Sequence, residues 1–284
     1  MAFWEKAPLL FKRYSLKREV KVFDVLRRAS RFLIHLSKEN TIFDISSAVI
    51  LRRCYRRAQF WAIVEEDKEP LLRCAPYFDN ILFYRDQKDI RGKLGGIRPQ
   101  VFIDFNHPGS TRLALASESD LRWGFYSKSA FPYFNLLVKG SEDNSFSLIA
   151  SLFKGVKPKM ITLRLSKDIR DKAKKWLKGE GYKMGIPLIL SDSKFSKILK
   201  SRIRGWVLSG EEVDREILPG VVALCRCFIG GSGLLFQLSI GFKRRSLLLL
   251  KEGSPHPSKI GFSKILEFRD LTQLPYREIE GFIK

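Results

Sequence analysis

Residues 31–65, RFLIHLSKENTIFDISSAVILRRCYRRAQFWAIVE, predict a strand, a helix and a second strand in succession. The apolar runs at 31–36 and 59–65 have the length and composition of buried strands. Between Thr41 and Tyr55, apolar residues repeat at helical spacing, at Ile42, Ile45, Val49 and Ile50. Because strands joined by a helix pair in parallel and are covered on both faces, this stretch predicts one unit of a parallel α/β sheet.

The alternation continues on both sides of a polar, Gly- and Pro-punctuated stretch at 139–159. Before that stretch, further strands are expected at 80–84, 100–105 and 122–126. After it, helices and strands are expected to alternate, at 167–178, 186–191, 209–227, 234–240 and 246–250. Ser209 and Glu212 form a capping-box pair that opens the helix at 209–227, and Pro219 is expected to kink that helix.

These patterns predict an α/β protein with two Rossmann-like domains facing a cleft. We expect a basic segment at 1–30, an N-terminal domain at 31–155, a C-terminal domain at 156–262 and a helical tail at 263–284. In such folds ligands bind outside the carboxyl ends of the strands. The candidate functional loops are therefore those that follow residues 36, 105, 190 and 229.

The charge of the chain points to an anionic partner. The 284 residues contain 52 Lys and Arg against 30 Asp and Glu, a formal net charge of +22. No apolar run reaches the roughly 18 residues that span a bilayer, and no secretory signal is visible. The four cysteines are sparse and give no sign of a disulfide scaffold. Aromatic and basic residues mix in segment 1–30, which predicts either contact with an anionic membrane or a packed terminal helix. A nucleic-acid partner is suggested by the charge alone, since the sequence contains no recognisable nucleic-acid-binding motif. We therefore expect no nucleic acid among the partners.

The loop after the first strand carries two carboxylates. Thr41 followed by Asp44 is a variant of the capping box, which predicts that Asp44 is held at the start of a helix. The alternative role for Asp44 is that of a general base projecting from the end of a strand. Glu39, in the loop itself, is the competing carboxylate.

A glycine-rich loop lies between a strand and a helix near the end of the chain, at Gly230, Gly231, Ser232 and Gly233. Glycines let a phosphate approach the backbone closely, although the loop has neither the P-loop lysine nor the dinucleotide-binding spacing. Its alternative reading is a tight turn. The segment 194–204 has five Lys and Arg and no acid, and we interpret it as a cationic loop that adds charge to the same phosphates.

The three histidines are scattered and have no metal-ligand spacing. His35 lies within a predicted strand and is interpreted as a core residue. His107 follows a strand and lies near Asp104, which makes it the most site-like of the three.

The order of these segments resembles the heptosyltransferase family, glycosyltransferase family 9. Matches to its first half occur in order and spacing, at Leu36, Ser37, Val64, Glu65, Glu66, Pro76 and Asp79. VFIDFNHPGSTRLALA with RWGF at 122–125 is similar to the family's Asp-centred strand and its Arg-Gly-Phe strand. ALCRCFIGGSGLLFQLSIGFKRRSLLLL is similar to its donor-binding segment.

The resemblance implies a GT-B fold and metal-independent transfer of a sugar from an ADP-heptose-like nucleotide sugar, with no further cofactor. It implies an anionic, lipid-linked acceptor such as the inner core of lipopolysaccharide. It also implies a cytoplasmic protein, peripheral at the inner face of the bacterial cytoplasmic membrane. The expected donor-binding residues are Gly230, Gly231, Ser232, Gly233, Lys194, Lys197 and Lys243. The expected acceptor-binding residues are Ser37, Asn40, Asp104, Asn106, His107 and Arg112.

The chain departs from the family pattern at the positions that carry the chemistry. The family's catalytic Asp falls on Thr41, which cannot accept a proton effectively near neutral pH. Its donor-binding Asp-Thr-Gly falls on 231–233, its His falls on Phe236, and one strand–helix step of the second domain is missing. For an active enzyme, Glu39 is the predicted base in preference to Asp44. The alternative is a non-catalytic protein of the same fold that binds sugar nucleotides or lipid.

Overall fold

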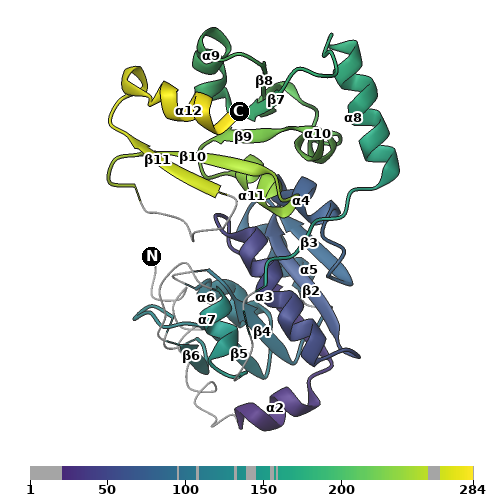
Figure 1. Ribbon diagram of the computed structural model, residues 1–284. Helices are drawn as coiled ribbons and strands as arrows, with labels where there is room; N and C mark the ends of the chain where they lie inside the picture. Colours follow the sequence, from purple (N-terminus) through teal and green to yellow (C-terminus); the bar gives the residue numbers. More distant parts are fainter. Residues whose placement is uncertain are drawn as a thin grey trace. The chain divides into compact units, whose positions relative to one another are not determined.

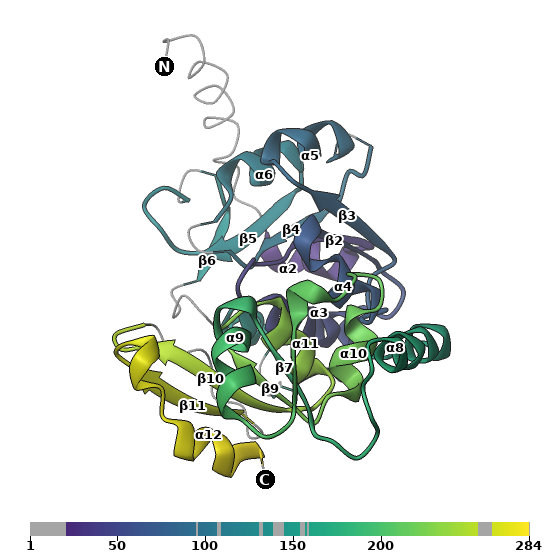
Figure 2. The same cartoon turned by 90° about the horizontal axis from the view of Figure 1, so that it is seen from above.

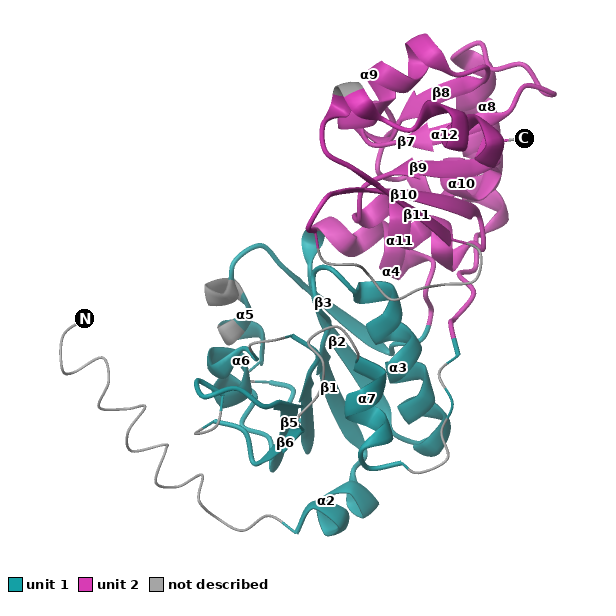
Figure 3. Cartoon of the chain, turned by 60° about the vertical axis from the view of Figure 1, so that its left-hand side comes forward, with its two compact units in different colours: residues 1–66, 77–159 teal, residues 67–76, 160–284 magenta. Residues whose placement is uncertain are grey.

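The computed structural model describes residues 21–94, 96–106, 109–130, 133–138, 145–153, 157, 159–254 and 263–283 (Figure 1). Two compact units divide the chain, one formed by residues 1–66 and 77–159 and the other by 67–76 and 160–284 (Figure 3). Segment 67–76, expected in the first domain, thus belongs to the second unit. Its short helix α4 (Glu69–Arg73) packs near α10 (Leu218–Leu224) and α11 (Leu234–Gly241). Arg164 N–H donates to the Cys74 carbonyl at 2.8 Å.

Unit 1 contains a parallel sheet in the order β3-β2-β1-β4-β5-β6, which is the strand order of dinucleotide-binding folds. Its strands are β1 (Arg31–His35), β2 (Gln59–Glu65), β3 (Asn80–Tyr84), β4 (Val101–Asp104), β5 (Leu121–Phe125) and β6 (Leu136–Val138). The expected strands are confirmed, and β6 is one that the sequence analysis did not predict. The short length of β6 explains this, since three residues carry too little pattern.

Helices cover both faces of this sheet, as the continuous apolar strands predicted. The helices of unit 1 are α2 (Val22–Arg28), α3 (Thr41–Cys54), α5 (Gln87–Leu94), α6 (Thr111–Ala116) and α7 (Ser145–Ala150). Helices α5 and α6 lie on one face and α3 and α7 on the other (Figures 2 and 3). Leu33 and Phe102 pack toward α5 and α6, while the neighbouring Phe32 stacks its ring on Phe60 at 4.8 Å. Alternate residues of one strand therefore fill two cores.

Unit 2 contains a second parallel sheet in the order β11-β10-β9-β7-β8, the flavodoxin-like arrangement. Its strands are β7 (Leu188–Ser191), β8 (Trp206–Ser209), β9 (Cys227–Gly230), β10 (Arg245–Lys251) and β11 (Ser263–Phe268). Its helices are α8 (Lys167–Gly179), α9 (Ser193–Arg202), α10 (Leu218–Leu224), α11 (Leu234–Gly241) and α12 (Tyr276–Ile283). Phe195 and Leu199 of α9 and Ile279 and Ile283 of α12 share one core cluster, and Phe236 and Ile240 of α11 belong to another.

Three expectations for unit 2 are wrong. The segment 263–284 is not a helical tail, because β11 pairs with β10 before α12 begins. The cationic segment 194–204 is mainly helix α9 rather than a loop, because Phe195 and Leu199 pack against the sheet. Together, α9 and β8 supply a strand–helix step that was expected to be missing.

The capping box at Ser209 and Glu212 is present, but it opens a single 3₁₀ turn at 210–212 instead of a long helix. Helix α10 begins only at Leu218. Pro219 therefore stands in the first turn, where its missing N–H has no helical partner to lose, and it does not kink the helix.

Strand order reverses once in each sheet, between β1 and β4 in unit 1 and between β7 and β9 in unit 2. Connections leave such a point on opposite faces, so a crevice opens outside the strand ends. Each unit thereby has one expected ligand position. None of the helices in the described residues is both long and apolar enough to cross a lipid bilayer.

Candidate functional site

A buried histidine–aspartate pair stands at the point in unit 1 where strand order reverses. His35 ends β1, Asp104 ends β4, and the two residues are register partners. His35 Nδ1 lies 3.0 Å from Asp104 Oδ1, and His35 Nε2 lies 2.8 Å from the Tyr84 hydroxyl. Since a carboxylate only accepts, we assign Nδ1–H as the donor to Asp104, which leaves Nε2 to accept from Tyr84. The carboxylate thus orients the imidazole.

Backbone groups hold the Asp104 carboxylate in place. Asn106 N–H donates to Oδ1 at 3.0 Å, and Ser110 N–H donates to Oδ2. Asp104 is fully buried and His35 is 2% exposed, so neither side chain moves without opening the site. The His35 side chain is therefore fixed in one orientation.

A cavity of about 320 Å³ opens in front of this pair. Its lining is formed by His35, Glu65, Tyr84, Asn106, Gly109, Ser110, Thr111 and Arg112. These groups include donors and acceptors, with the guanidinium of Arg112 and the carboxylate of Glu65 among them, and Glu65 pairs with Lys38 at 3.1 Å. Such a lining suits a ligand with several hydroxyl groups and a negative charge.

The cavity contains only part of the expected acceptor set. Asn106 and Arg112 line it and Asp104 lies directly behind His35, whereas Ser37 and Asn40 are not among the lining residues. His107 lies outside the described residues.

Sequence analysis named two of the eight lining residues, Asn106 and Arg112, and gave His35 a purely structural role. His35, Glu65 and Tyr84 are the last residues of β1, β2 and β3. The sequence signal that would have identified these residues is a polar side chain at the carboxyl end of each of three neighbouring strands.

The Thr41–Asp44 capping box is wrong. The helix cap is Asn40, without a side-chain hydrogen bond, and Thr41 Oγ1 instead donates to the Ser37 carbonyl at 2.6 Å. Asp44 Oδ2 accepts from Ser37 N–H at 2.6 Å and from Ser37 Oγ at 2.5 Å. Asp44 is 1% exposed, and burial raises its pKa to about 7 against the lowering effect of the Ser37 hydrogen bonds. Thr41 is fully buried, and Glu39 is exposed.

The raised pKa of Asp44 predicts a pH-dependent stability. Between about pH 4 and pH 7 the folded state holds this proton more tightly than the unfolded state, so stability falls as pH rises and then levels off. The full shift corresponds to about 4 kcal/mol. In Asp44→Asn the amide oxygen can accept both Ser37 hydrogen bonds, and the side chain no longer titrates. We therefore expect the melting temperature of this variant to depend much less on pH between about pH 4 and pH 7 than that of the parent. Asp171→Asn, an exposed change on α8, should keep the slope, and an unchanged slope in Asp44→Asn would contradict the assignment.

The reversal point of unit 2 combines the glycine loop with a carboxylate that sequence analysis missed. Gly230 ends β9, and Asp192 follows β7. Asp192 Oδ2 accepts from Gly231 N–H at 2.7 Å, and Asp192 Oδ1 is buried without a hydrogen-bond partner among the described residues. A Cβ at Gly230 would lie 2.9 Å from both carboxylate oxygens, so only glycine allows this approach. Burial raises the pKa of Asp192, opposed by the Gly231 hydrogen bond and by Lys194.

The expected phosphate-binding cations do not all reach this loop. Lys194 and Lys197 stand on α9 rather than on a loop, and Lys194 Nζ lies 5.6 Å from the Phe195 ring centroid. Lys243 follows α11 and precedes β10, so it stands at the amino edge of the sheet, opposite the glycine loop. Since α11 is about 12 Å long, the assignment of Lys243 to the donor phosphates is wrong.

No family model matches this chain, and no curated protein sequence matches it. Solved structures do. The E. coli ADP-heptose LPS heptosyltransferase II has a TM-score of 0.70 at 11% identity, covering 89% of this chain and 97% of its own.

The glycosyltransferase family 9 protein from Veillonella parvula has a TM-score of 0.68 at 10% identity, with 84% and 86% covered. E. coli heptosyltransferase WaaC with ADP has a TM-score of 0.60 at 14% identity, with 89% and 96% covered. The chain therefore has a heptosyltransferase-like GT-B fold, as its sequence resemblance predicted.

Proposed function

We propose that this protein is a glycosyltransferase that moves a sugar from a nucleotide-activated donor to a hydroxyl of an anionic glycan. The observation that carries the proposal is the polar cavity of unit 1, where an aspartate-backed histidine faces space for a ligand. The heptosyltransferase-like fold supports it, because that fold is the one expected for transfer from a nucleotide sugar. Solved WaaC structures contain ADP or ADP-2-deoxy-2-fluoro heptose, which supports an ADP-linked donor for this chain.

His35 is our proposed general base. The acceptor hydroxyl would replace the Tyr84 hydroxyl at Nε2 and give its proton to the imidazole as its oxygen bonds to the sugar carbon. The bond from that carbon to the diphosphate breaks, and the nucleoside diphosphate leaves with the electron pair. Asp104 would stabilise the resulting imidazolium. Arg112 would hold a phosphate or carboxylate of the acceptor.

Glu39 and Asp44 are weaker candidates on geometric grounds. Neither lines the cavity, Glu39 is exposed, and both hydrogen bonds of Asp44 Oδ2 come from Ser37. The sequence-based assignment of Glu39 as the base stays a prediction, and it competes with our proposal for His35.

Donor binding at Gly230–Gly233 would require a change at Asp192. A diphosphate seated on Gly231 N–H would meet the carboxylate that already accepts from it. The donor would bind either with Asp192 protonated or with its side chain rotated away. As finer parts of the proposal, the donor is ADP-heptose-like, the acceptor is a lipid-linked envelope glycan, and the protein works peripherally at the cytoplasmic face of the membrane.

Two observations favour a second candidate, a non-catalytic protein that binds sugar nucleotides. Thr41 occupies the position of the family's catalytic Asp, and its hydroxyl is bound to the protein's own backbone. In the glycine loop, Gly231 N–H already donates a hydrogen bond to the Asp192 carboxylate, at the place where a donor phosphate would bind.

A panel of nucleotide sugars separates these candidates. We expect calorimetry to show tighter binding of an ADP-sugar than of UDP-, GDP- and CMP-sugars. We also expect slow release of ADP when that ADP-sugar is incubated with the purified protein. Binding without release of nucleotide, even with bacterial envelope glycans as acceptors, would support the non-catalytic candidate. Absence of binding across the panel would contradict both.

A further inference from the structure

The amino edge of the second sheet, opposite the glycine loop, forms a basic surface with its own cavity. Pro187 directly precedes β7, Arg226 directly precedes β9, and Arg204 lies two residues before β8. These three strands are parallel neighbours, so their starts meet at one edge. Trp206 N–H donates to the Pro187 carbonyl at 2.9 Å, which joins two of the starts.

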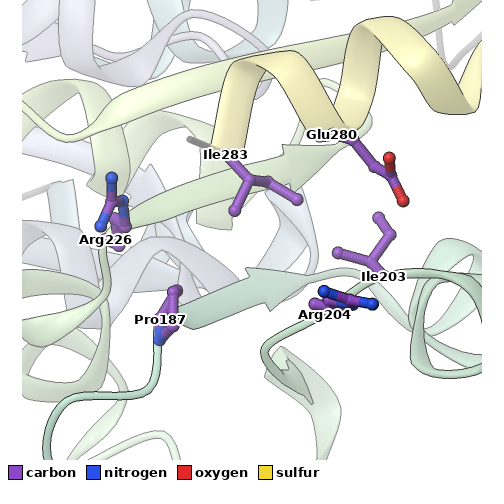
Figure 4. A pocket seen from close by; sticks show the side chains of 6 residues that line it. All are labelled: Pro187, Ile203, Arg204, Arg226, Glu280 and Ile283. Carbon is purple, nitrogen blue, oxygen red and sulfur yellow. The ribbon is translucent and has the colours of Figure 1, made fainter.

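Helix α12 closes this edge into a cavity of about 510 Å³ (Figure 4). It is lined by Pro187, Ile203, Arg204, Arg226, Glu280 and Ile283. Figure 4 shows the two arginines on either side of Pro187, with Ile283 of α12 pointing into the space. Ile203 and Ile283 are buried, whereas both arginines are exposed. An apolar floor under exposed guanidinium groups fits a phosphate headgroup that carries apolar chains.

Cations outnumber acids around this cavity. Lys183 precedes β7, and Lys243 and Arg245 precede or begin β10, the strand beside β9. Arg245 also lies over the Phe282 ring, 4.7 Å from its centroid. Glu280 is the acid that lines the cavity. The edge therefore has a positive field that would attract an anionic surface.

The loop before β7 adds exposed apolar side chains to this edge. Met184 is 95% exposed and Ile186 is 40% exposed. The loop is structured, because the Tyr182 hydroxyl donates to the Ile186 carbonyl at 2.8 Å and the Tyr182 ring meets Trp206 edge to face. Exposed apolar side chains on a fixed loop beside cations favour a bilayer interface, since a nucleic acid offers nothing comparable to bury them.

We propose that this amino edge docks on anionic phospholipid. Met184 and Ile186 insert at the boundary between headgroups and acyl chains, and Arg204 and Arg226 hold a lipid phosphate at the mouth of the 510 Å³ cavity. The proposal locates the membrane contact of the proposed function and does not depend on transferase activity. The surface lies at the edge opposite the glycine loop, so docking leaves that loop open.

The test is vesicle co-sedimentation of the full chain with phosphatidylcholine vesicles, with and without 30 mol% phosphatidylglycerol, in a buffer free of phosphate. Each cation near an anionic surface contributes about 1 kcal/mol. We expect Arg204→Glu with Arg226→Glu to weaken binding to the anionic vesicles at least tenfold. Met184→Ser with Ile186→Ser should weaken binding to the anionic vesicles severalfold, both at low and at high salt concentration. The basic segment 1–30 is present in all variants and contributes equally.

The matched control is Lys174→Glu with Lys175→Glu, two exposed residues of α8 that change the net charge by the same amount. It should weaken binding less than threefold. Equal losses in the control and arginine variants would overturn the proposal in favour of nonspecific attraction. Full binding by the Met184 and Ile186 variant, together with displacement of the vesicles by duplex DNA, would overturn it in favour of a nucleic-acid surface. Melting temperatures verify that each variant is folded.

Discussion

His35→Gln should lower the rate of sugar transfer by about 10²- to 10⁴-fold while leaving nucleotide affinity unchanged, because a general base acts on the acceptor and not on the donor. The measurement is single-turnover formation of glycosylated product with the donor found in the panel. His35 is buried and bonded to both Asp104 and Tyr84, so the melting temperature must accompany the rate.

Two companion variants separate catalysis from structure. Asp104→Asn keeps the size of the side chain but removes the charge that stabilises the imidazolium, so it should shift the pH–rate profile as well as lower the rate. Glu39→Gln changes an exposed residue that does not line the cavity and should transfer at nearly the parent rate. A large loss in Glu39→Gln with a normal rate in His35→Gln would return the role of base to Glu39.

Substitutions at Asp192 and at Gly231 should change the affinity for nucleotide in opposite directions. Asp192→Ser removes a carboxylate from the glycine loop, and we expect ADP to bind about 10- to 100-fold more tightly, since a like charge within about 4 Å costs a few kcal/mol near a protein surface. Asp192 makes no side-chain capping hydrogen bond to α9, so the substitution removes no such bond from the helix. Gly231→Val should abolish binding, because its Cβ would lie 3.2 Å from Asp192 and would cover the backbone amide.

Calorimetry with ADP at several pH values measures both effects. Because burial raises the pKa of Asp192, the parent should bind ADP more tightly as pH falls, and Asp192→Ser should lose that dependence. Asp192→Asn separates charge from size, because it is neutral and nearly isosteric. Gly179→Ala is the control, since it lies at the exposed end of α8, away from the loop, and its Cβ would have no heavy atom within 4 Å. Equal ADP affinity in the parent, Asp192→Ser and Gly231→Val would mean that the loop is only a turn.

The elements that sequence analysis identified correctly are those with a strong local pattern. The apolar run 59–65 became β2 with the same bounds, and the helical spacing after Thr41 became α3. The glycine loop was also found, because a strand, glycines and a helix follow one another directly along the chain. The errors fall where a local pattern has two outcomes. Residues 263–268 alternate in a way that suits an edge strand or a helix, and pairing with β10 selected the strand.

The residues that make up the candidate site are distant in the chain. His35, Glu65 and Tyr84 close three different strands, and Asp192 reaches Gly231 across 39 positions. Local composition and spacing were enough for the α/β class, the parallel strands and the heptosyltransferase-like order of segments, because each depends on neighbours along the chain. The order in which strands pair depends instead on burying both faces of a sheet at once. Only that packing brought Asp104 behind His35 and a carboxylate onto the glycine loop.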